Sequence, residues 1–401
     1  MKTHFGILVC LLVSSSAHCQ WQRHTVDDLG RGADGVRIED VDGDGLDDIV
    51  TGWEESGHIC LYVQPTLEKI REPWPRVVVG KSPSVEDAFA IDLDQDGIKE
   101  IISCHEGKTH QVLIHRLRIA TAPASRSDLL QAKNWQSVGI ASCQGVSRWM
   151  FATGLRRGTD KEQGKVLAVG SKDPQGQVSL LLPPADGVDD LTQWRRIQLQ
   201  PAGWIMSLVA LDMDLDGDED LVVSDRKGSD RGVYWLEQPD DAEAFSVAER
   251  WVRHEVGGHE SEVMFLDARP DAIVAATRGD GILRWARSPK GSADGEGTWQ
   301  RSRTAAPFGI VNGKAVRRME HHGQPWFVFT ANRGVDRSDH GKPAVSLFSF
   351  EPSLQPIDIG GDAGVKFDRI EVRDLDQDGD LDILTCEERD NLGVFWYENP
   401  G

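Results

Sequence analysis

Four copies of one acidic pattern constrain the fold of this chain more than any other feature. Each copy places carboxylates at its first, third, fifth and ninth positions and a glycine at its sixth. The copies run over Asp40–Asp48, Asp92–Glu100, Asp212–Asp220 and Asp374–Asp382. Their first residues are 52, 120 and 162 positions apart, which corresponds to one, two and three periods of about 52 to 60 residues. A period of this size is typical of propellers and solenoids.

Degenerate copies fill the missing phases of this repeat. They fall at Met150–Gly154, Met264–Arg269 and Val316–Glu320, so four intact and three degenerate copies make seven units. A second series has the same period. It consists of Trp21, Trp74, Trp135, Trp194, Trp251 and Trp299, with Leu354 in the seventh place. Both series therefore predict seven structural units.

Each unit is expected to form four short strands. An apolar strand precedes the acidic loop, as in Trp204–Leu211, and a second strand follows it, as in Asp220–Ser224. A third strand ends in proline and a fourth opens with tryptophan, and glycine or proline bounds these runs. Four-stranded units arranged radially make an all-β, seven-bladed β-propeller.

The two ends of the chain predict how the ring closes. The repeat begins on a fourth strand, Trp21–Val26, and ends on a third strand, Gly393–Tyr397. The N-terminal strand should therefore complete the blade that the C-terminus forms, which protects sheet edges that would otherwise invite aggregation. An open solenoid is the alternative, but it would need capping repeats that the sequence does not show.

The N-terminus resembles an export signal. An apolar run, Phe5–Val13, is too short to span a bilayer, and the small residues Ala17 and Cys19 fit a cleavage site. We expect a signal peptide over 1–19 and a single propeller over 20–401, in a secreted or periplasmic protein. A lipid anchor on Cys19 is the alternative. No other apolar run reaches membrane-spanning length, so no transmembrane segment is expected.

Charge and cysteine content narrow the set of partners. The net charge of −21 argues against a nucleic-acid or anionic-membrane partner. Four cysteines lie beyond the signal, Cys60, Cys104, Cys143 and Cys386, which is too few for a disulfide scaffold. Buried thiols and bridges both remain open, and we expect a monomer.

The acidic loops have the composition of a calcium site. Ca²⁺ takes six to eight oxygen ligands, and an EF-hand loop would need glutamate at position twelve. Position twelve holds Thr51, Ser103, Val223 or Thr385 instead. Solvated acidic turns are the alternative, but four turns with one spacing disfavour it.

The loops resemble those of FG-GAP (VCBS-type) repeats, such as the propeller of integrin α-subunits. This resemblance covers nearly the whole mature chain and implies about four structural Ca²⁺ ions, with none in the degenerate units. The implied ligands are Asp40, Asp42, Asp44, Asp48, Asp92, Asp94, Asp96, Glu100, Asp212, Asp214, Asp216, Asp220, Asp374, Asp376, Asp378 and Asp382. Further segments, among them Gly203–Ser207 and Ser224–Gly228, look like a bacterial FG-GAP group of unassigned activity.

The opposite face of the ring is the expected ligand face. Residues before the first strand and after the second strand of each blade should crowd the mouth of the central channel, as Asp34 and Glu54 do in the first unit. Charged and aromatic residues occupy these positions throughout. The candidates are Arg37, Glu86, Asp87, Arg148, Trp149, Trp204, Arg226, Lys227, Arg278, Lys314, Arg333, Lys366, Asp368 and Glu387. Such a mixture suits a polar ligand such as a sugar, although a solvated rim of ion pairs is the alternative.

Three functions fit these features. The first is a non-enzymatic binding module for carbohydrate or another extracellular polymer. The second is a sugar-active lyase or dehydratase, by analogy with the similar propeller of fungal aldos-2-ulose dehydratase, with His105, Glu106, His259 and Glu262 as candidate acid–base residues. The third is an adhesion or assembly scaffold that binds an extracellular protein. No G-x-S-x-G or H-E-x-x-H motif is present.

Overall fold

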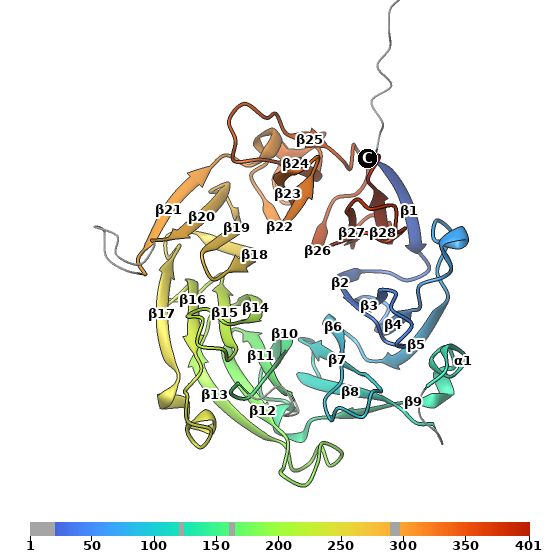
Figure 1. The fold of residues 1–401 in the computed structure, drawn as a ribbon, viewed down its shortest axis with the longest axis vertical. Coiled ribbons are helices and arrows are strands. Elements are labelled where there is room, and N and C mark those ends of the chain that lie inside the picture. The colour runs from blue at the N-terminus through green and yellow to red at the C-terminus, as the bar shows by residue number, and fades with distance from the viewer. Residues whose placement is uncertain (1–20, 120–123, 160–164, 289–296) are drawn as a thin grey trace, which may run out of the picture.

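The computed structural model describes residues 21–119, 124–159, 165–288 and 297–401. The expected signal peptide lies outside these residues. Seven four-stranded sheets stand in a ring around a central channel (Figure 1). Neighbouring strands in every sheet are antiparallel. The prediction of an all-β, seven-bladed propeller is confirmed.

The strands of the blades follow one another along the chain. Blade one contains β2 (Ala33–Glu39), β3 (Asp48–Trp53), β4 (His58–Tyr62) and β5 (Arg76–Lys81), and blade two contains β6 (Val85–Ile91), β7 (Glu100–His105), β8 (Gln111–Leu117) and β9 (Trp135–Gly139). Blade three contains β10 (Arg148–Leu155), β11 (Val166–Lys172), β12 (Gln177–Leu182) and β13 (Arg195–Pro201), and blade four contains β14 (Ile205–Leu211), β15 (Asp220–Asp225), β16 (Gly232–Glu237) and β17 (Val252–Gly257). Blade five contains β18 (Glu262–Arg269), β19 (Ala272–Arg278), β20 (Ile282–Arg287) and β21 (Trp299–Thr304), and blade six contains β22 (Gly313–His321), β23 (Gln324–Ala331), β24 (Val345–Phe348) and β25 (Ile357–Asp358). Blade seven contains β26 (Phe367–Arg373), β27 (Asp382–Glu387), β28 (Gly393–Glu398) and β1 (Gln22–Asp27).

Helical structure is limited to short turns outside the sheets. The described residues contain one four-residue helix, α1 (Arg126–Leu129). The 3₁₀ turns are η1 (Leu67–Lys69), η2 (Ala132–Asn134), η3 (Ala141–Cys143), η4 (Ala244–Ser246), η5 (Ala248–Arg250), η6 (Pro307–Gly309) and η7 (Arg337–Asp339). No helix in the described ranges is long and apolar enough to cross a bilayer.

The two ends of the chain share blade seven. Strand β1 pairs with β28, and Thr25 lies opposite Phe395. Side chains of the paired strands also interact: His24 Nε2 lies 2.7 Å from Glu398 Oε2, and the His24 ring packs on Trp396. The predicted closure of the ring is therefore confirmed, and the open solenoid is not formed.

A register irregularity recurs at the start of every innermost strand. Each of the seven ladders between the first and second strands of a blade shifts register within the first few residues of the first strand, as between Asp34 and Arg37 in blade one. A bulge of this kind redirects the side chains beside it. It therefore sets which residues near the channel mouth point into the channel and which point into a blade.

The repeated tryptophans hold the outer strands. Trp74, Trp135, Trp194 and Trp251 are buried, and each indole Nε1 donates to the carbonyl of Ile70, Leu129, Val188 or Phe245 respectively, at 2.8 to 3.1 Å. The bond satisfies the only polar atom of a large apolar side chain. Trp299, the sixth member of the series, is only half-buried.

Because Trp194 is buried and Trp299 is only half-buried, we expect alanine substitution of the two residues to destabilise the protein unequally. Trp194→Ala removes a buried ring and leaves a cavity, so we expect it to lower the free energy of unfolding by about 3–5 kcal/mol. Trp299→Ala, the matched control, should cost well under half of that. Urea denaturation of both variants measures the difference, and equal losses would contradict the packing described above.

The same core shows the state of the four cysteines beyond the expected signal peptide. Cys60, Cys104, Cys143 and Cys386 are all buried, and none is in a disulfide. Burial raises the pKa of the Cys60 and Cys143 thiols to about 12, so these two groups stay protonated near neutral pH.

Candidate functional site

The acidic loops join the first and second strands of blades one, two, four and seven. In the first loop, both carboxylate oxygens of Asp40 accept backbone hydrogen bonds, from Gly43 N at 2.7 Å and from Gly45 N at 3.0 Å. The bond from the sixth residue to the first aspartate recurs in the other three loops. The sixth residue has a positive φ in all four loops, between 83° and 106°, which explains its glycine.

The ninth residue of each loop is buried. The carboxylate of Asp48 accepts from Val41 N and Gln64 N, both at 2.9 Å, and so ties the loop to the end of β4. Asp220 and Asp382 repeat this arrangement with Gln238 N and Asn399 N. The sequence patterns predict no role for Gln64, Gln238 and Asn399, although each directly precedes the proline that ends a third strand. Their side-chain amides donate to loop carbonyls as well.

Loop two departs from the other three. Glu100 accepts from Leu93 N at 3.2 Å. Its second oxygen lies 3.6 Å from the side-chain Nε of Arg116 on the third strand, where the other loops accept a backbone N–H from a residue beyond that strand. Glu100, the one position-nine residue that is not aspartate, therefore has different partners from Asp48, Asp220 and Asp382.

The donor set of the loops fits a hard divalent cation. Oxygens of Asp40, Asp42 and Asp48 lie within 4.8 Å of one another, as do those of Asp92, Asp94 and Asp96 and those of Asp212, Asp214 and Asp220. Burial raises the pKa of Asp48 and Asp220 to about 7, so the loops hold carboxylates that need a positive charge to stay ionised.

Buried aspartate oxygens without a hydrogen-bond partner also support a cation site in the loops. Oδ1 atoms of Asp92, Asp218, Asp376 and Asp380 are buried and have no hydrogen-bond partner among the described residues. Asp218 and Asp380 occupy position seven of their loops, so they lie outside the ligand set that the resemblance implies. In the last loop Asp376 also forms an ion pair with Arg71 at 2.5 Å, which would compete with a cation.

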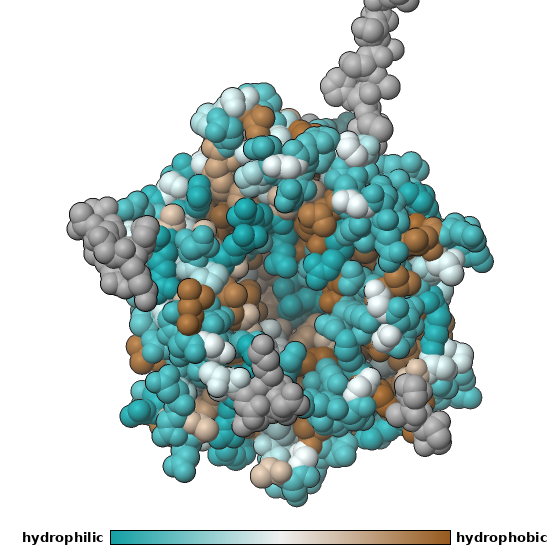
Figure 2. Space-filling view, viewed as in Figure 1, coloured by the Kyte–Doolittle hydropathy of each residue, from teal (hydrophilic) through white to brown (hydrophobic). Residues whose placement is uncertain are grey.

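The channel mouth lies on the face opposite these loops. Strand one of each blade runs toward its acidic loop and strand two returns from it, so the start of one and the end of the other meet at the far face. Figure 2 shows that the ring is hollowed at its centre and that hydrophilic residues predominate on the face in view.

Blades one, two and seven give the mouth an acidic sector, which we define as Asp34, Glu54, Glu86, Asp368 and Glu388. Oxygens of Asp34, Glu54 and Glu86 lie within 4.8 Å of one another, and Asp34 forms a second such group with Asp368 and Glu388. Burial, with Asp368 nearby, raises the pKa of Asp34 to about 7. Burial, with Asp34 nearby, raises the pKa of Glu86 to about 8.

Lysines neutralise part of this sector. Lys314 pairs with Asp368, and Lys366 pairs with Glu388 and lies 3.7 Å from Asp368. Lys172 on blade three pairs with Glu106. These contacts bring together charged residues from blades two, three, six and seven.

Blades three and four give the mouth a basic sector, which we define as Arg148, Lys172, Trp204, Arg226 and Lys227. The Trp204 ring has three cations over it: Lys172 Nζ at 4.4 Å, Arg226 Cζ at 4.5 Å and Lys227 Nζ at 5.0 Å from its centroid. Arg148 lies directly opposite Lys172 in the β10–β11 ladder and is exposed. Arg148 and Lys227 have no ion-pair partner in the described part of the chain.

Next to the basic sector lies an ion-pair group. Glu262 Oε2 accepts from Arg226 Nε at 2.7 Å and lies 3.8 Å from Arg278. Arg226 and Arg278 are thus at the expected face but already have a carboxylate partner.

Four candidate ligand residues instead have internal roles. Trp149 is fully buried in the core of blade three, where its Nε1 donates to Cys143 O at 3.0 Å. Glu387 is fully buried and caps backbone N–H groups, including Val365 and Lys366 at 3.1 Å. Arg333 donates to carbonyls of the loop before β26. Asp87 is fully buried and paired with Arg37 Nη2 at 2.8 Å. These four side chains thus contact the protein interior, and their role as ligand contacts stays a prediction.

The candidate acid–base histidines do not lie at the mouth. His105 is fully buried between Ser103 Oγ, at 2.8 Å, and Pro83 O, at 3.1 Å, and burial lowers its pKa to about 4. His259 contacts Arg231 O at 2.7 Å and lies 3.6 Å from Glu255 on the outer strand of blade four. Glu106 and Glu262 are held in the ion pairs given above. Among the described residues, neither histidine forms a hydrogen bond or an ion pair with Glu106 or Glu262.

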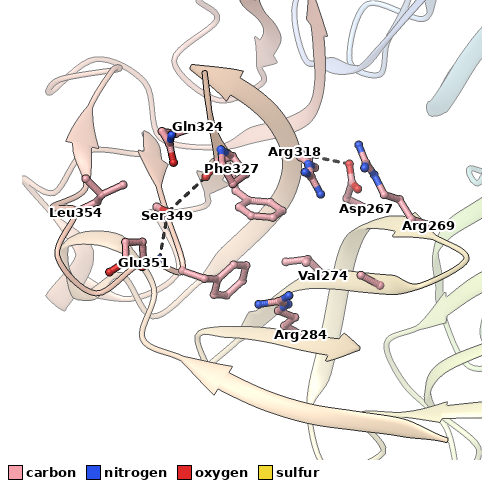
Figure 3. A pocket seen from close by; sticks show the side chains of 13 residues that line it. Asp267, Arg269, Val274, Arg284, Arg318, Gln324, Phe327, Ser349, Glu351 and Leu354 are labelled. Carbon is pink, nitrogen blue, oxygen red and sulfur yellow. Dashed lines mark hydrogen bonds between the residues drawn. The ribbon is translucent and has the colours of Figure 1, made fainter. Parts of the chain in front are cut away.

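A separate pocket of about 480 Å³ lies between blades five and six, on the face of the acidic loops (Figure 3). Phe327, Phe350 and Leu354 supply its apolar wall, and Arg284 lies 5.2 Å from the Phe350 ring centroid. No residue that the sequence singles out as a ligand contact lines it. Both flanking units are degenerate, so shorter turns replace the acidic loops there.

Comparison with known proteins identifies the repeat. Residues 40–103, which run from the first acidic loop into β7, match the family described as FG-GAP-like repeat. The chain is thus a seven-bladed β-propeller that contains an FG-GAP-like repeat, a combination that suggests a binding or scaffold module. No match was found among curated proteins.

Two solved structures have a similar fold. The crystal structure of BBS1N in complex with ARL6DN, soaked with mercury, has a TM-score of 0.51 at 10% identity, covering 94% of this chain and 96% of that one. The same complex soaked with lead has a TM-score of 0.50 at 9% identity, covering 94% and 97%. At these identities the likeness shows the fold alone.

Proposed function

We propose that the protein is a secreted, calcium-stabilised binding module whose channel mouth binds an anionic extracellular polymer, with an acidic carbohydrate as the first choice. The acidic loops stabilise the blades and lie on the opposite face. The basic sector supplies the ligand contacts, because it gathers positive charge locally on a chain whose net charge of −21 disfavours polyanions elsewhere on the surface.

The observation that carries this proposal is the basic sector itself. Arg148 and Lys227 present cations with no carboxylate partner in the described ranges. Lys227 Nζ lies over the Trp204 ring, and Arg148 lies opposite Lys172, whose Nζ is over the same ring. Cations without an internal partner attract an anionic ligand at little desolvation cost. The aromatic ring beside them offers a planar surface of the kind that polar ligand sites use for orientation.

A binding titration tests the proposal. We expect the protein to bind polygalacturonate and to bind the neutral polymer dextran much more weakly. The double variant Arg148→Glu/Lys227→Glu should weaken polygalacturonate binding by about tenfold or more, because it replaces two attractive contacts with repulsive ones. Lys69→Glu/Lys133→Glu, which replaces two exposed lysines on η1 and η2, is the control matched for charge. Equal affinities for the two variants would sink the proposal.

An adhesion or assembly scaffold is the second candidate. The pocket between blades five and six favours it, because it combines exposed apolar and arginine side chains on a face that the channel mouth does not use. The similar propeller of BBS1N is in complex with a protein, ARL6DN. Binding of a protein partner that Phe350→Asp abolishes, and that Lys227→Glu leaves unchanged, would favour this candidate.

A further inference from the structure

Three carboxylates from three different strand ends converge at the channel mouth. Asp34 lies at the start of β2, Glu54 directly follows β3, and Glu86 lies at the start of β6. One oxygen from each lies within 4.8 Å of the other two. We call this group the mouth triad. It is assembled across two blades, whereas each acidic loop is one short segment of chain.

Two members of the mouth triad are buried without a partner. Asp34 is 7% exposed and Glu86 is 8% exposed. The described residues give neither side chain a hydrogen bond or an ion pair. A buried carboxylate without a partner costs several kcal/mol. Either a proton or a cation between the oxygens offsets this cost, and the convergence of three oxygens favours the cation.

The neighbouring lysines lie close enough to act on the charges of Asp34 and Glu86, but among the described residues they form their ion pairs with other carboxylates. Lys314 and Lys366 pair with Asp368 and Glu388, and Lys172 pairs with Glu106. These contacts distinguish the mouth triad from the second group around Asp34, whose other two carboxylates already have lysine partners. Six carboxylates thus face three lysines at this part of the mouth, and the surplus lies in the mouth triad.

We propose that Asp34, Glu54 and Glu86 bind one divalent cation of the hard class, such as Ca²⁺, Mg²⁺ or Mn²⁺, separate from the acidic loops. Carboxylate oxygens are the preferred ligands of these ions. Three carboxylates fill only part of the coordination shell of such an ion. The remaining positions lie on the side of half-buried Glu54, toward solvent. Water or an oxygen of an incoming ligand would fill them. The site is independent of the polymer proposed above, because its test uses the metal alone.

Manganese provides the probe, because its anomalous scattering locates each bound ion. In crystals of the full chain grown with MnCl₂, we expect an anomalous peak between Asp34, Glu54 and Glu86. The variant Asp34→Asn/Glu86→Gln should lose that peak and keep those of the acidic loops. Glu55→Gln, the next residue along the chain, should keep it. Glu55 is exposed and pairs with Arg31 at 3.3 Å instead.

A solution titration gives the stoichiometry. Free Mn²⁺, followed by electron paramagnetic resonance, should show one bound ion fewer per chain in the double variant than in the wild type and in Glu55→Gln. If the double variant does not fold, Glu54→Gln should show the same loss from a half-buried position. The absence of a peak at the mouth triad in wild-type crystals, or equal stoichiometry in wild type and variant, would overturn the proposal.

Discussion

Removing divalent cations with EDTA is expected to lower the melting temperature of this protein by roughly 10 °C or more. Each acidic loop concentrates carboxylates, and burial holds the ninth one out of solvent, as in Asp382, whose pKa burial raises to about 8. Without a cation these charges repel. With one, each occupied site contributes about 2–3 kcal/mol when the ion is present at a hundred times its dissociation constant.

Thermal unfolding monitored by circular dichroism measures this effect, first in CaCl₂ and then in EDTA. Adding excess CaCl₂ after EDTA should restore the melting temperature, which separates metal loss from other actions of the chelator. The variant Asp212→Asn/Asp214→Asn should melt lower than wild type in CaCl₂ and approach it in EDTA. A melt that is the same in CaCl₂ and EDTA would refute calcium stabilisation.

Deleting the N-terminal strand is expected to have the second-largest effect. A chain that begins after Asp27 lacks β1, the strand that completes blade seven. It exposes the edge of β28 and loses the buried side chains of Trp21 and Val26. The lost burial and hydrogen bonds should together lower the free energy of unfolding by more than about 5 kcal/mol, and the open edge should promote aggregation.

Urea denaturation and light scattering measure the loss of β1. The matched control is a chain that begins at Trp21 and keeps the whole strand. Supplying a synthetic peptide with the sequence of residues 21–28 should partly restore the stability of the truncated chain, because it can pair with β28 in the native register. A truncated chain as stable as its control would show that β1 does not close the ring.

The sequence allows the fold to be predicted because its repeats mark the same structural position in each blade. Asp40 and Asp212 open equivalent loops, and Trp74 and Trp194 open equivalent fourth strands. Phase alone then places β1 beside β28. These signals survive small errors in strand boundaries, because the period of the repeat is much longer than any strand.

The candidate site is harder to predict because it depends on single-residue register. Neighbouring residues on a strand point to opposite faces, and the bulge near the start of each first strand redirects them again. Arg148 is exposed at the mouth, whereas Trp149 is buried in its blade. No composition signal marks that bulge. Glu387 and His105 follow the same logic, because both end second strands and both turn inward.

The contact of Gln64, Gln238 and Asn399 with the position-nine aspartates is also marked in the sequence. Each stands directly before the proline that ends a third strand, in the three blades whose loops have aspartate at position nine. Blade two has glutamate at that position and no such Gln–Pro or Asn–Pro pair. The covariation within one chain would have predicted the contact between loop and strand.

The affinity for polygalacturonate, measured by isothermal titration calorimetry in saturating CaCl₂, tests most directly whether binding and stability reside on opposite faces. Arg148→Glu/Lys227→Glu should bind at least tenfold more weakly than wild type and melt at the same temperature. Asp212→Asn/Asp214→Asn should melt lower and, below its transition, bind as wild type does. Loss of binding in the loop variant together with full binding in the mouth variant would contradict this division of the propeller.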